Sequence, residues 1–388
     1  MTDTAFRTPA LTSRLPQVGT TIFTVMSRLA AECGAINLSQ GFPDFSPDPA
    51  LLGLVEKHLR GGANQYAPMA GVPALREAIA AKAAALYGTA YDPEQEITVT
   101  AGGTQAIFTA ITCAVRPGDE VLIFEPAYDC YAPAVELAGG RVVRAALRHP
   151  DYRPDWEEVR GLLSPRTRLV VINTPHNPTG STWSAADLDA LAALLRGTGT
   201  LVLSDEVYEH MVFDGRRHES CARHRELAER SFVVGSFGKT FHATGWKIGS
   251  VMAPTALMAE FRKVHQFVVF AVNRPIQEAL AEHLREPAAY RGLAAFYQQR
   301  RDRFRAGLAA TRLQALPCAG TYFQIASYAA VSDEPDVALA ERLTRELGVA
   351  SIPVSVFSEA PRQDRVLRFC FAKELETLDR ACERLARL

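Results

Sequence analysis

Short runs of apolar and β-branched residues recur through the middle of this chain, and each is followed by a segment long enough for a helix. The runs lie at 96–100, 120–124, 168–173, 201–205 and 231–236. They are continuously apolar, as strands are when helices cover both faces of their sheet. Because parallel neighbours need a crossover between them, this alternation predicts an α/β fold with a mostly parallel sheet.

One connection departs from this alternation. Only about ten residues separate Ser236 from the next strand-like run, 247–253, which is close to the shortest crossover that parallel strands allow. We therefore expect residues 247–253 to form an antiparallel strand.

The character of the chain changes after a helical pattern at 255–269. Residues 276–311 look helical and highly charged, and the short strand-like runs 321–327 and 366–371 flank a helical pattern around 336–347. Strands and helices in this arrangement are typical of a second, smaller α+β domain.

The length of the chain also favours two domains, because 388 residues exceed what one hydrophobic core usually serves. We expect residues 1–40 to form an N-terminal arm and part of the small domain. Residues 41–280 would form the large ligand-binding domain, and 281–388 the small C-terminal domain. Residues 1–20, rich in small polar residues, read as a mobile arm.

Charge and cysteine usage narrow the class of protein. The formal net charge is −1, which favours neither nucleic acid nor an anionic membrane as a partner. No apolar run approaches the length that spans a bilayer, and residues 1–20 lack the apolar core of a signal peptide. Seven scattered cysteines without a CxxC pair are typical of reduced thiols. We expect a cytoplasmic protein without a metal site.

Unusual residues follow the strand candidates, where open parallel sheets bind ligands. Gly102, Gly103 and Thr104 follow residues 96–100 and open a helix whose free N–H groups suit a phosphate. An ordinary strand-to-helix turn explains the same residues. The absence of a Walker motif and of a full GxGxxG disfavours a nucleotide.

Three further strand ends carry aromatic, amide and carboxylate side chains. Tyr128 follows 120–124, although packing alone explains it. Asn177 precedes Pro178, and a cis bond there would aim the amide into a cleft. Asp205 ends a buried strand, where a carboxylate needs a partner: it is either a helix N-cap or the counter-ion of a cationic ligand. Tyr208 lies three residues on.

The segment VVGSFGKTFHATGWKIG, 233–249, holds two lysines on a glycine-spaced loop. A partly desolvated lysine near another cation loses its proton readily and becomes an amine nucleophile able to form a Schiff base. Solvated loop lysines are the alternative for Lys239 and Lys247 taken singly.

Pyridoxal 5′-phosphate is the one ligand that these side chains match as a set. It requires a phosphate site, an aromatic face, donors to a phenolic oxygen, a carboxylate for the pyridinium nitrogen and a lysine for the aldehyde. The sequence offers each of these in turn: Gly103, Thr104, Ser236 and Lys247; Tyr128; Asn177 and Tyr208; Asp205; and Lys239.

These motifs resemble those of the fold-type I, class I pyridoxal-phosphate aminotransferases. The specific stretches are NTPHNPTG (173–180), SDEVYEHMVF (204–213) and SFGKTFHATGWKIG (236–249), and the resemblance extends from INLSQGFPDF (36–45) to RFCFAK (368–373). Within the family the chain most resembles the methionine and kynurenine/glutamine aminotransferases. The resemblance implies a seven-stranded large-domain sheet with one antiparallel strand.

The resemblance also implies a role for each site residue. Lys239 forms the Schiff base, Asp205 keeps the ring nitrogen protonated, and Tyr128 stacks on the ring. Asn177 and Tyr208 bond the phenolic oxygen. The remaining cofactor contacts are Gly103, Thr104, Gln105, Ser236, Lys247 and Tyr66, the last reaching the partner subunit of a homodimer with shared sites. Many relatives carry Arg where Lys247 stands, which leaves the cofactor assignment unchanged.

The substrate contacts follow from the same resemblance. Arg368 clamps the α-carboxylate, a task that suits a guanidinium fork, with help from Gly41 and Asn177. Phe23, Phe357 and, across the dimer, Phe270 make an apolar side-chain pocket, although each is equally explained as core. Arg274 lies near Phe270 in the sequence, so a dicarboxylic substrate remains an alternative.

The implied reaction is ping-pong transfer of an amino group from an apolar or aromatic L-amino acid to a 2-oxo acid. Methionine, phenylalanine, tyrosine, glutamine and kynurenine are the candidate donors. A cysteine-conjugate β-lyase, which uses the same Lys239 and Asp205, is the alternative. A non-catalytic regulator is disfavoured because no helix-turn-helix precedes the body of the chain.

Overall fold

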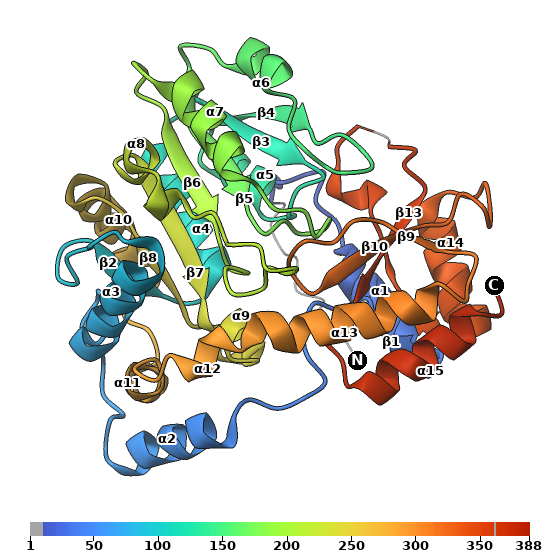
Figure 1. The fold of residues 1–388 in the computed structure, drawn as a ribbon. Coiled ribbons are helices and arrows are strands. Elements are labelled where there is room, and N and C mark those ends of the chain that lie inside the picture. The colour runs from blue at the N-terminus through green and yellow to red at the C-terminus, as the bar shows by residue number, and fades with distance from the viewer. Residues whose placement is uncertain (1–10, 361) are drawn as a thin grey trace, which may run out of the picture.

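The computed structural model of the chain describes residues 11–360 and 362–388 (Figure 1). Its main sheet has seven strands, in the order β2 (Ile97–Thr100), β8 (Gly249–Met252), β7 (Ser231–Ser236), β6 (Leu201–Asp205), β5 (Thr167–Asn173), β3 (Glu120–Glu125) and β4 (Arg141–Ala146). Strand β8 runs antiparallel to both neighbours, and the other neighbouring pairs are parallel. The predicted α/β sheet with one antiparallel strand is confirmed.

Helices cover both faces of this sheet, which explains why its strands are apolar throughout. Val121 and Ile123 of β3 face a cluster built with α4 (Gly103–Ala114), α5 (Tyr131–Leu137) and α10 (Thr255–Val268). Leu122 and Phe124 face the opposite cluster, which includes α3 (Pro73–Tyr87) and α7 (Ala185–Leu195). The short α6 (Trp156–Leu162) and α8 (Arg225–Ala228) lie beside α7 (Figure 1). Each fully buried aliphatic or aromatic side chain contributes about 1.5–3 kcal/mol to folding.

A second, antiparallel sheet lies in the C-terminal part, in the order β12 (Ile352–Pro353), β13 (Val366–Cys370), β10 (Phe323–Ser327) and β9 (Gln314–Ala315). Helices α14 (Asp336–Arg342), extended by a π-helical turn at Leu343–Leu347, and α15 (Leu375–Leu385) pack nearby. An N-terminal segment joins this part: α1 (Ile22–Glu32) precedes β1 (Ile36–Asn37), which pairs in parallel with β11 (Val349–Ala350). Residues far apart in sequence therefore build one α+β unit.

The charged segment 276–311 is helical, as predicted, and consists of three helices. They are α11 (Arg274–His283), α12 (Ala288–Arg291) and α13 (Leu293–Leu308). The breaks fall at Pro287, which lacks a backbone N–H, and at Gly292, a weak helix former. Helix α11 packs on α2 (Pro49–Arg60) and α3, and α13 runs on toward α15 (Figure 1).

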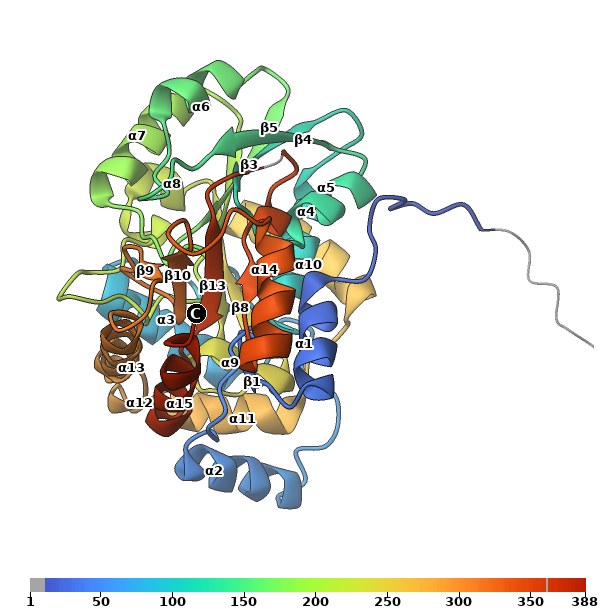
Figure 2. The same ribbon diagram turned by 90° about the vertical axis from the view of Figure 1, so that its right-hand side faces the viewer.

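Residues 11–21, which precede α1, pass beside α5 and extend outward (Figure 2). Residues 1–10 of the expected arm fall outside the described residues. Residues 11–20 form neither helix nor strand and are mostly exposed; Arg14 Nη2 donates to the carbonyl oxygen of Leu137 at 2.9 Å. Within the described ranges, no helix has the length and apolar character needed to cross a membrane.

Candidate active site

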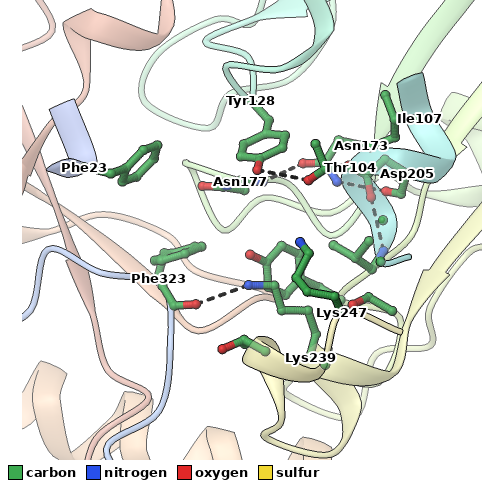
Figure 3. Close-up of a pocket in the computed structure, with 18 of the residues that line it drawn as sticks. Phe23, Thr104, Ile107, Tyr128, Asn173, Asn177, Asp205, Lys239, Lys247 and Phe323 are labelled. Carbon is green, nitrogen blue, oxygen red and sulfur yellow. Dashed lines mark hydrogen bonds between the residues drawn. The ribbon is translucent and has the colours of Figure 1, made fainter. Parts of the chain in front are cut away.

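A cavity of about 320 Å³ opens beyond the carboxyl ends of the large-sheet strands. Figure 3 shows Phe23 and Phe323 toward one end, Asp205 toward the other, and Lys239 and Lys247 along one side. The sequence-predicted residues that line it are Phe23, Gly41, Gly103, Thr104, Tyr128, Asn177, Asp205, Tyr208, Ser236, Lys239, Lys247 and Arg368. Residues as far apart in the sequence as Phe23 and Arg368 thus meet in one space.

Asp205 is a buried carboxylate at the end of β6, in register with Asn173 of β5. The Tyr131 hydroxyl donates to Oδ2 at 2.6 Å, and the Val207 N–H donates to Oδ1 at 3.3 Å. Burial raises the pKa of Asp205 to about 6, although these two hydrogen bonds and the charge of Lys239 act in the opposite direction. No helix begins after β6, so the N-cap alternative is wrong. The carboxylate is suited to hold a ligand N–H cation.

Lys239 lies on the single-turn helix α9 (Phe237–Thr240), which follows β7. Its Nζ donates to the Tyr322 hydroxyl at 2.7 Å and to the Gly41 carbonyl at 3.2 Å. Desolvation lowers the pKa of Lys239 from 10.5 to about 8, and the cations of Arg368 and Lys247 act in the same direction. An amine with this pKa is available as a nucleophile and as a base near neutral pH.

The start of α4 leaves its backbone N–H groups open, because Gly102 and Gly103 carry no side chain; we call this turn the cradle. Gly102 adopts φ +82°, and a Cβ placed there would lie 3.3 Å from Lys247 Nζ. A Cβ on Gly103 would lie 3.0 Å from Val207 Cγ1. The first turn of α4 has no acidic residue, and the Thr104 hydroxyl lies 3.5 Å from the Tyr128 hydroxyl. Free backbone N–H groups, a lysine and a hydroxyl together suit a phosphate group.

Arg368 of β13 is fully buried, and its guanidinium is only partly bonded. Nη1 donates to Asn177 Oδ1 at 2.8 Å, and Nη2 donates to the Ser39 carbonyl at 2.9 Å. Nε has no partner, and among the described residues no carboxylate pairs with this cation. Burial lowers the pKa of Arg368 to about 10. A buried guanidinium with an unused N–H is suited to bind a carboxylate ligand.

Four sequence-predicted residues do not line the cavity. The Gln105 side chain bonds Ala101 N and Thr109 Oγ1 instead, at 2.9 and 2.6 Å. Phe357 packs against Phe23, which lines the cavity, with the two ring centres 5.8 Å apart. Tyr66 and Phe270 are exposed and pack edge to face at 5.3 Å.

Residues that sequence reasoning missed include Gln40, Asn173 and Phe323, which line the cavity, and Tyr131 and Tyr322, which bond Asp205 and Lys239. The sequence offered a signal for Tyr131, because this residue lies in the same motif as Tyr128, EPAYDCY. Nothing local marks Tyr322, whose contact with Lys239 spans 83 positions of the chain. The predicted cis bond between Asn177 and Pro178 is present.

These donors fit pyridoxal 5′-phosphate group by group. The buried carboxylate of Asp205 suits the ring nitrogen, the cradle at Gly102 the phosphate, and the amine of Lys239 the aldehyde. A mostly parallel seven-stranded sheet carrying this set at its carboxyl edge defines a pyridoxal-phosphate-dependent enzyme of fold type I.

Comparison with known proteins gives the family. Residues 34–385 match the family described as aminotransferase class I and II. The chain belongs to this family; it is an aminotransferase, and pyridoxal phosphate is its cofactor.

Relatives match along almost the whole chain. A methionine aminotransferase of Escherichia coli is 53% identical over 377 residues, 97% of this chain and 98% of its own length. Mouse kynurenine–oxoglutarate transaminase 1 is 36% identical, covering 92% of this chain and 93% of its own. A crystal structure from E. coli, reported with a methionine aminotransferase function, has a TM-score of 0.97, 53% identity and coverage of 98% and 100%.

Proposed function

We propose that this aminotransferase prefers apolar and aromatic L-amino acids, with methionine as the representative donor and a 2-oxo acid as acceptor. One observation carries the proposal: aromatic rings surround the buried guanidinium of Arg368. Its Cζ lies 3.9 Å from the ring centre of Phe323, 5.3 Å from Phe23 and 5.4 Å from Phe357. A side chain projecting from a carboxylate held by Arg368 would meet apolar surface.

The charges around the cavity support the same preference over aspartate or glutamate. Its lysine and arginine lining residues are Lys239, Lys247 and Arg368, and each has a task in the proposal. Arg274, which left dicarboxylates open, does not line the cavity and pairs with Glu278 at 3.1 Å. Within one described subunit no further cation faces a second substrate carboxylate.

The proposed roles follow from the geometry of the side chains. Arg368 and Asn177 would orient the α-carboxylate, and an Oδ atom of Asp205 would accept a hydrogen bond from the protonated ring nitrogen. Bound pyridoxal phosphate supplies an aldehyde that captures the amino group and a ring that takes up the electron pair left at Cα. Lys239 Nζ, whose pKa lies near 8, would take the proton from the substrate Cα and deliver it to C4′, the former aldehyde carbon of the cofactor. Phe23 and Phe323 exclude water.

The other cofactor contacts remain part of the proposal. Tyr128 would stack on the ring, and Tyr208 and Asn177 would bond its oxygen. The phosphate would meet Gly103, Thr104, Ser236 and Lys247. The Gln105 side chain is committed elsewhere, so only its backbone N–H is retained.

We further propose a homodimer in which Tyr66 and Phe270 serve the partner's site. These rings are 79% and 48% exposed, and Phe267 beside them is 85% exposed, which is unusual for large apolar side chains of a monomer. We also propose that the domain boundaries lie at residues 40 and 280, and that the protein is cytoplasmic. The seven cysteines, all in described residues, are free thiols, in keeping with a reducing compartment.

Steady-state kinetics with a panel of amino acids tests the substrate proposal. We expect kcat/KM for methionine to exceed that for aspartate by roughly 100-fold, with the parallel-line pattern of a ping-pong reaction. Preference for aspartate or glutamate would overturn the proposal. Lys239→Ala should abolish turnover and change the absorbance of bound cofactor. Pyruvate release from cystathionine without an oxo acid would favour the lyase alternative.

A further inference from the structure

A short turn between β12 and β13 places Phe357 beside the site, and two different parts of the molecule hold this turn. The 3₁₀ turn η4 (Ser355–Phe357) begins against α14. The Ser355 N–H donates to Asp336 Oδ2 at 2.8 Å, and its hydroxyl donates to Oδ1 at 2.6 Å. The start of the turn is therefore fixed to the C-terminal unit.

The end of the turn is fixed to the large sheet instead. The Ala127 N–H donates to the Phe357 carbonyl at 2.7 Å. The Glu359 N–H donates to both carboxylate oxygens of Glu125, at 3.2 and 3.3 Å. Glu125 is the last residue of β3 and is 9% exposed. Its carboxylate thus holds the backbone two residues beyond Phe357.

Arg144 of the neighbouring strand β4 holds Glu125 in this position. Its Nε donates to Glu125 Oε1 at 3.0 Å, and its Nη1 pairs with Glu359 Oε2 at 2.9 Å. Since the carboxylate is partly buried, this cation offsets part of its desolvation. Arg144, Glu125 and Glu359 form one bridge from the sheet edge to the turn.

We propose that Glu125 is a positioning residue that sets substrate selectivity by fixing the turn that carries Phe357. The inference rests on the proposed function, in which the substrate side chain meets the aromatic rings around Arg368. Phe357 packs against both Phe23 and Arg368, with its ring centre 5.8 Å from that of Phe23 and 5.4 Å from Arg368 Cζ. A shift of the turn removes the support that this ring gives Phe23, which lines the cavity where a long substrate side chain would lie, and leaves the α-carboxylate contact in place.

The test compares methionine with alanine as donors for the holoenzyme of Glu125→Gln. The amide keeps the shape but has only one acceptor oxygen and no charge, so its NH2 group faces a donor, either Arg144 or the Glu359 N–H, and the ion pair with Arg144 is lost. We expect kcat/KM for methionine to fall roughly 10-fold, through KM, while the value for alanine stays within about twofold. The absorbance of bound cofactor should not change. Arg144→Met, at a less buried position, should give the same result.

Glu120→Gln is the matched control. Glu120 begins the same strand, is 2% exposed, and accepts from Arg141, Arg166 and Ser164. It resembles Glu125 in chemistry and burial but lies at the opposite end of β3. We expect this variant to lose stability without changing the methionine-to-alanine ratio. Equal changes of that ratio in Glu120→Gln and Glu125→Gln would overturn the inference.

A double-mutant cycle tests whether Glu125 acts through Phe357. In a Phe357→Ala background, Glu125→Gln should no longer alter the methionine-to-alanine ratio, because the ring that it positions is gone. Additive effects would overturn the inference. Wild-type preference for aspartate would instead remove the proposed function. An unchanged ratio in Glu125→Gln, with methionine still preferred by the wild type, would remove only the inference.

Discussion

Three ionisable side chains are buried around the cavity without a full set of partners. Asp205 has a raised pKa, Lys239 and Arg368 have lowered ones, and desolvation is the first cause in each. Such groups destabilise a fold, and they tend to gather where a charged ligand stabilises them. In the proposed function, the cofactor and the substrate carboxylate would supply the partners that these three groups lack.

The lowered pKa of Lys239 makes the stability of the cofactor-free protein depend on pH. Between pH 8 and 10.5 the unfolded state binds more protons at this residue than the folded state does. The free energy of unfolding should therefore rise with pH in this window, because the penalty for burying the ammonium disappears. Urea unfolding of the apoprotein at several pH values measures this. Lys239→Met should remove that part of the slope; an equal slope in both proteins would contradict the prediction.

The guanidinium of Arg368 should matter equally for every amino donor. Arg368→Lys keeps the charge but loses the planar fork, so kcat/KM should fall roughly 10- to 100-fold for methionine, phenylalanine and alanine alike. Steady-state kinetics with the three donors checks this. A loss confined to methionine would place Arg368 at the substrate side chain instead.

The positions at which strands and helices begin and end decide which side chains reach the cavity. The apolar runs and their continuations predicted β2, β3, β5, β6 and β7, because a strand buried on both faces is legible in the sequence. Strand β4 was missed, since it lies at the sheet edge and carries Arg141 and Arg144. The two-residue strands of the C-terminal part have no pattern long enough to detect. Because α9 is a single turn, β8 returns at once, and Lys239 and Lys247 face one cavity.

The turn between β2 and α4 should tolerate no side chain. Gly102→Ala strains a residue at φ +82° and also presses on Lys247. Gly118→Ala is the control, because φ is +89° but no atom lies within 4 Å. Both variants should lose about 1 kcal/mol or more in chemical denaturation. Only Gly102→Ala should lose cofactor on dialysis, followed by absorbance. Equal retention in both variants would argue against a phosphate at this turn.

Tyr66 and Phe270 are exposed aromatic side chains that do not line the cavity of their own subunit. Their ring centres lie 5.3 Å apart, outside the cavity, whereas the resemblance assigns both residues to the active site of the partner subunit. In the proposed dimer they would enter the partner's site. In that dimer a single chain would present an incomplete pocket, and its activity would depend on assembly.

Mixed dimers test this sharing. Lys239→Ala and Tyr66→Ala should each be impaired alone. After subunit exchange, the hybrid contains one site with both wild-type residues, so activity should reappear. Mixing Lys239→Ala with Asp205→Ala gives the control: both residues serve the same subunit's site, but each hybrid site keeps one defect, so activity should stay low. Restoration in neither mixture, with exchange verified by mass spectrometry, would assign Tyr66 to its own subunit.

The sequence by itself determined the parallel sheet, its antiparallel return strand and the chemistry at each strand end. These features are local: a buried strand is apolar, and an unusual residue directly after it is visible. Only the tertiary structure decided which distant groups meet. Lys239 reaches Tyr322 across 83 positions, Glu359 reaches Glu125 across 234, and Arg368 reaches Ser39 across 329. Such contacts depend on how the C-terminal unit packs against the large sheet, and no local pattern encodes that packing.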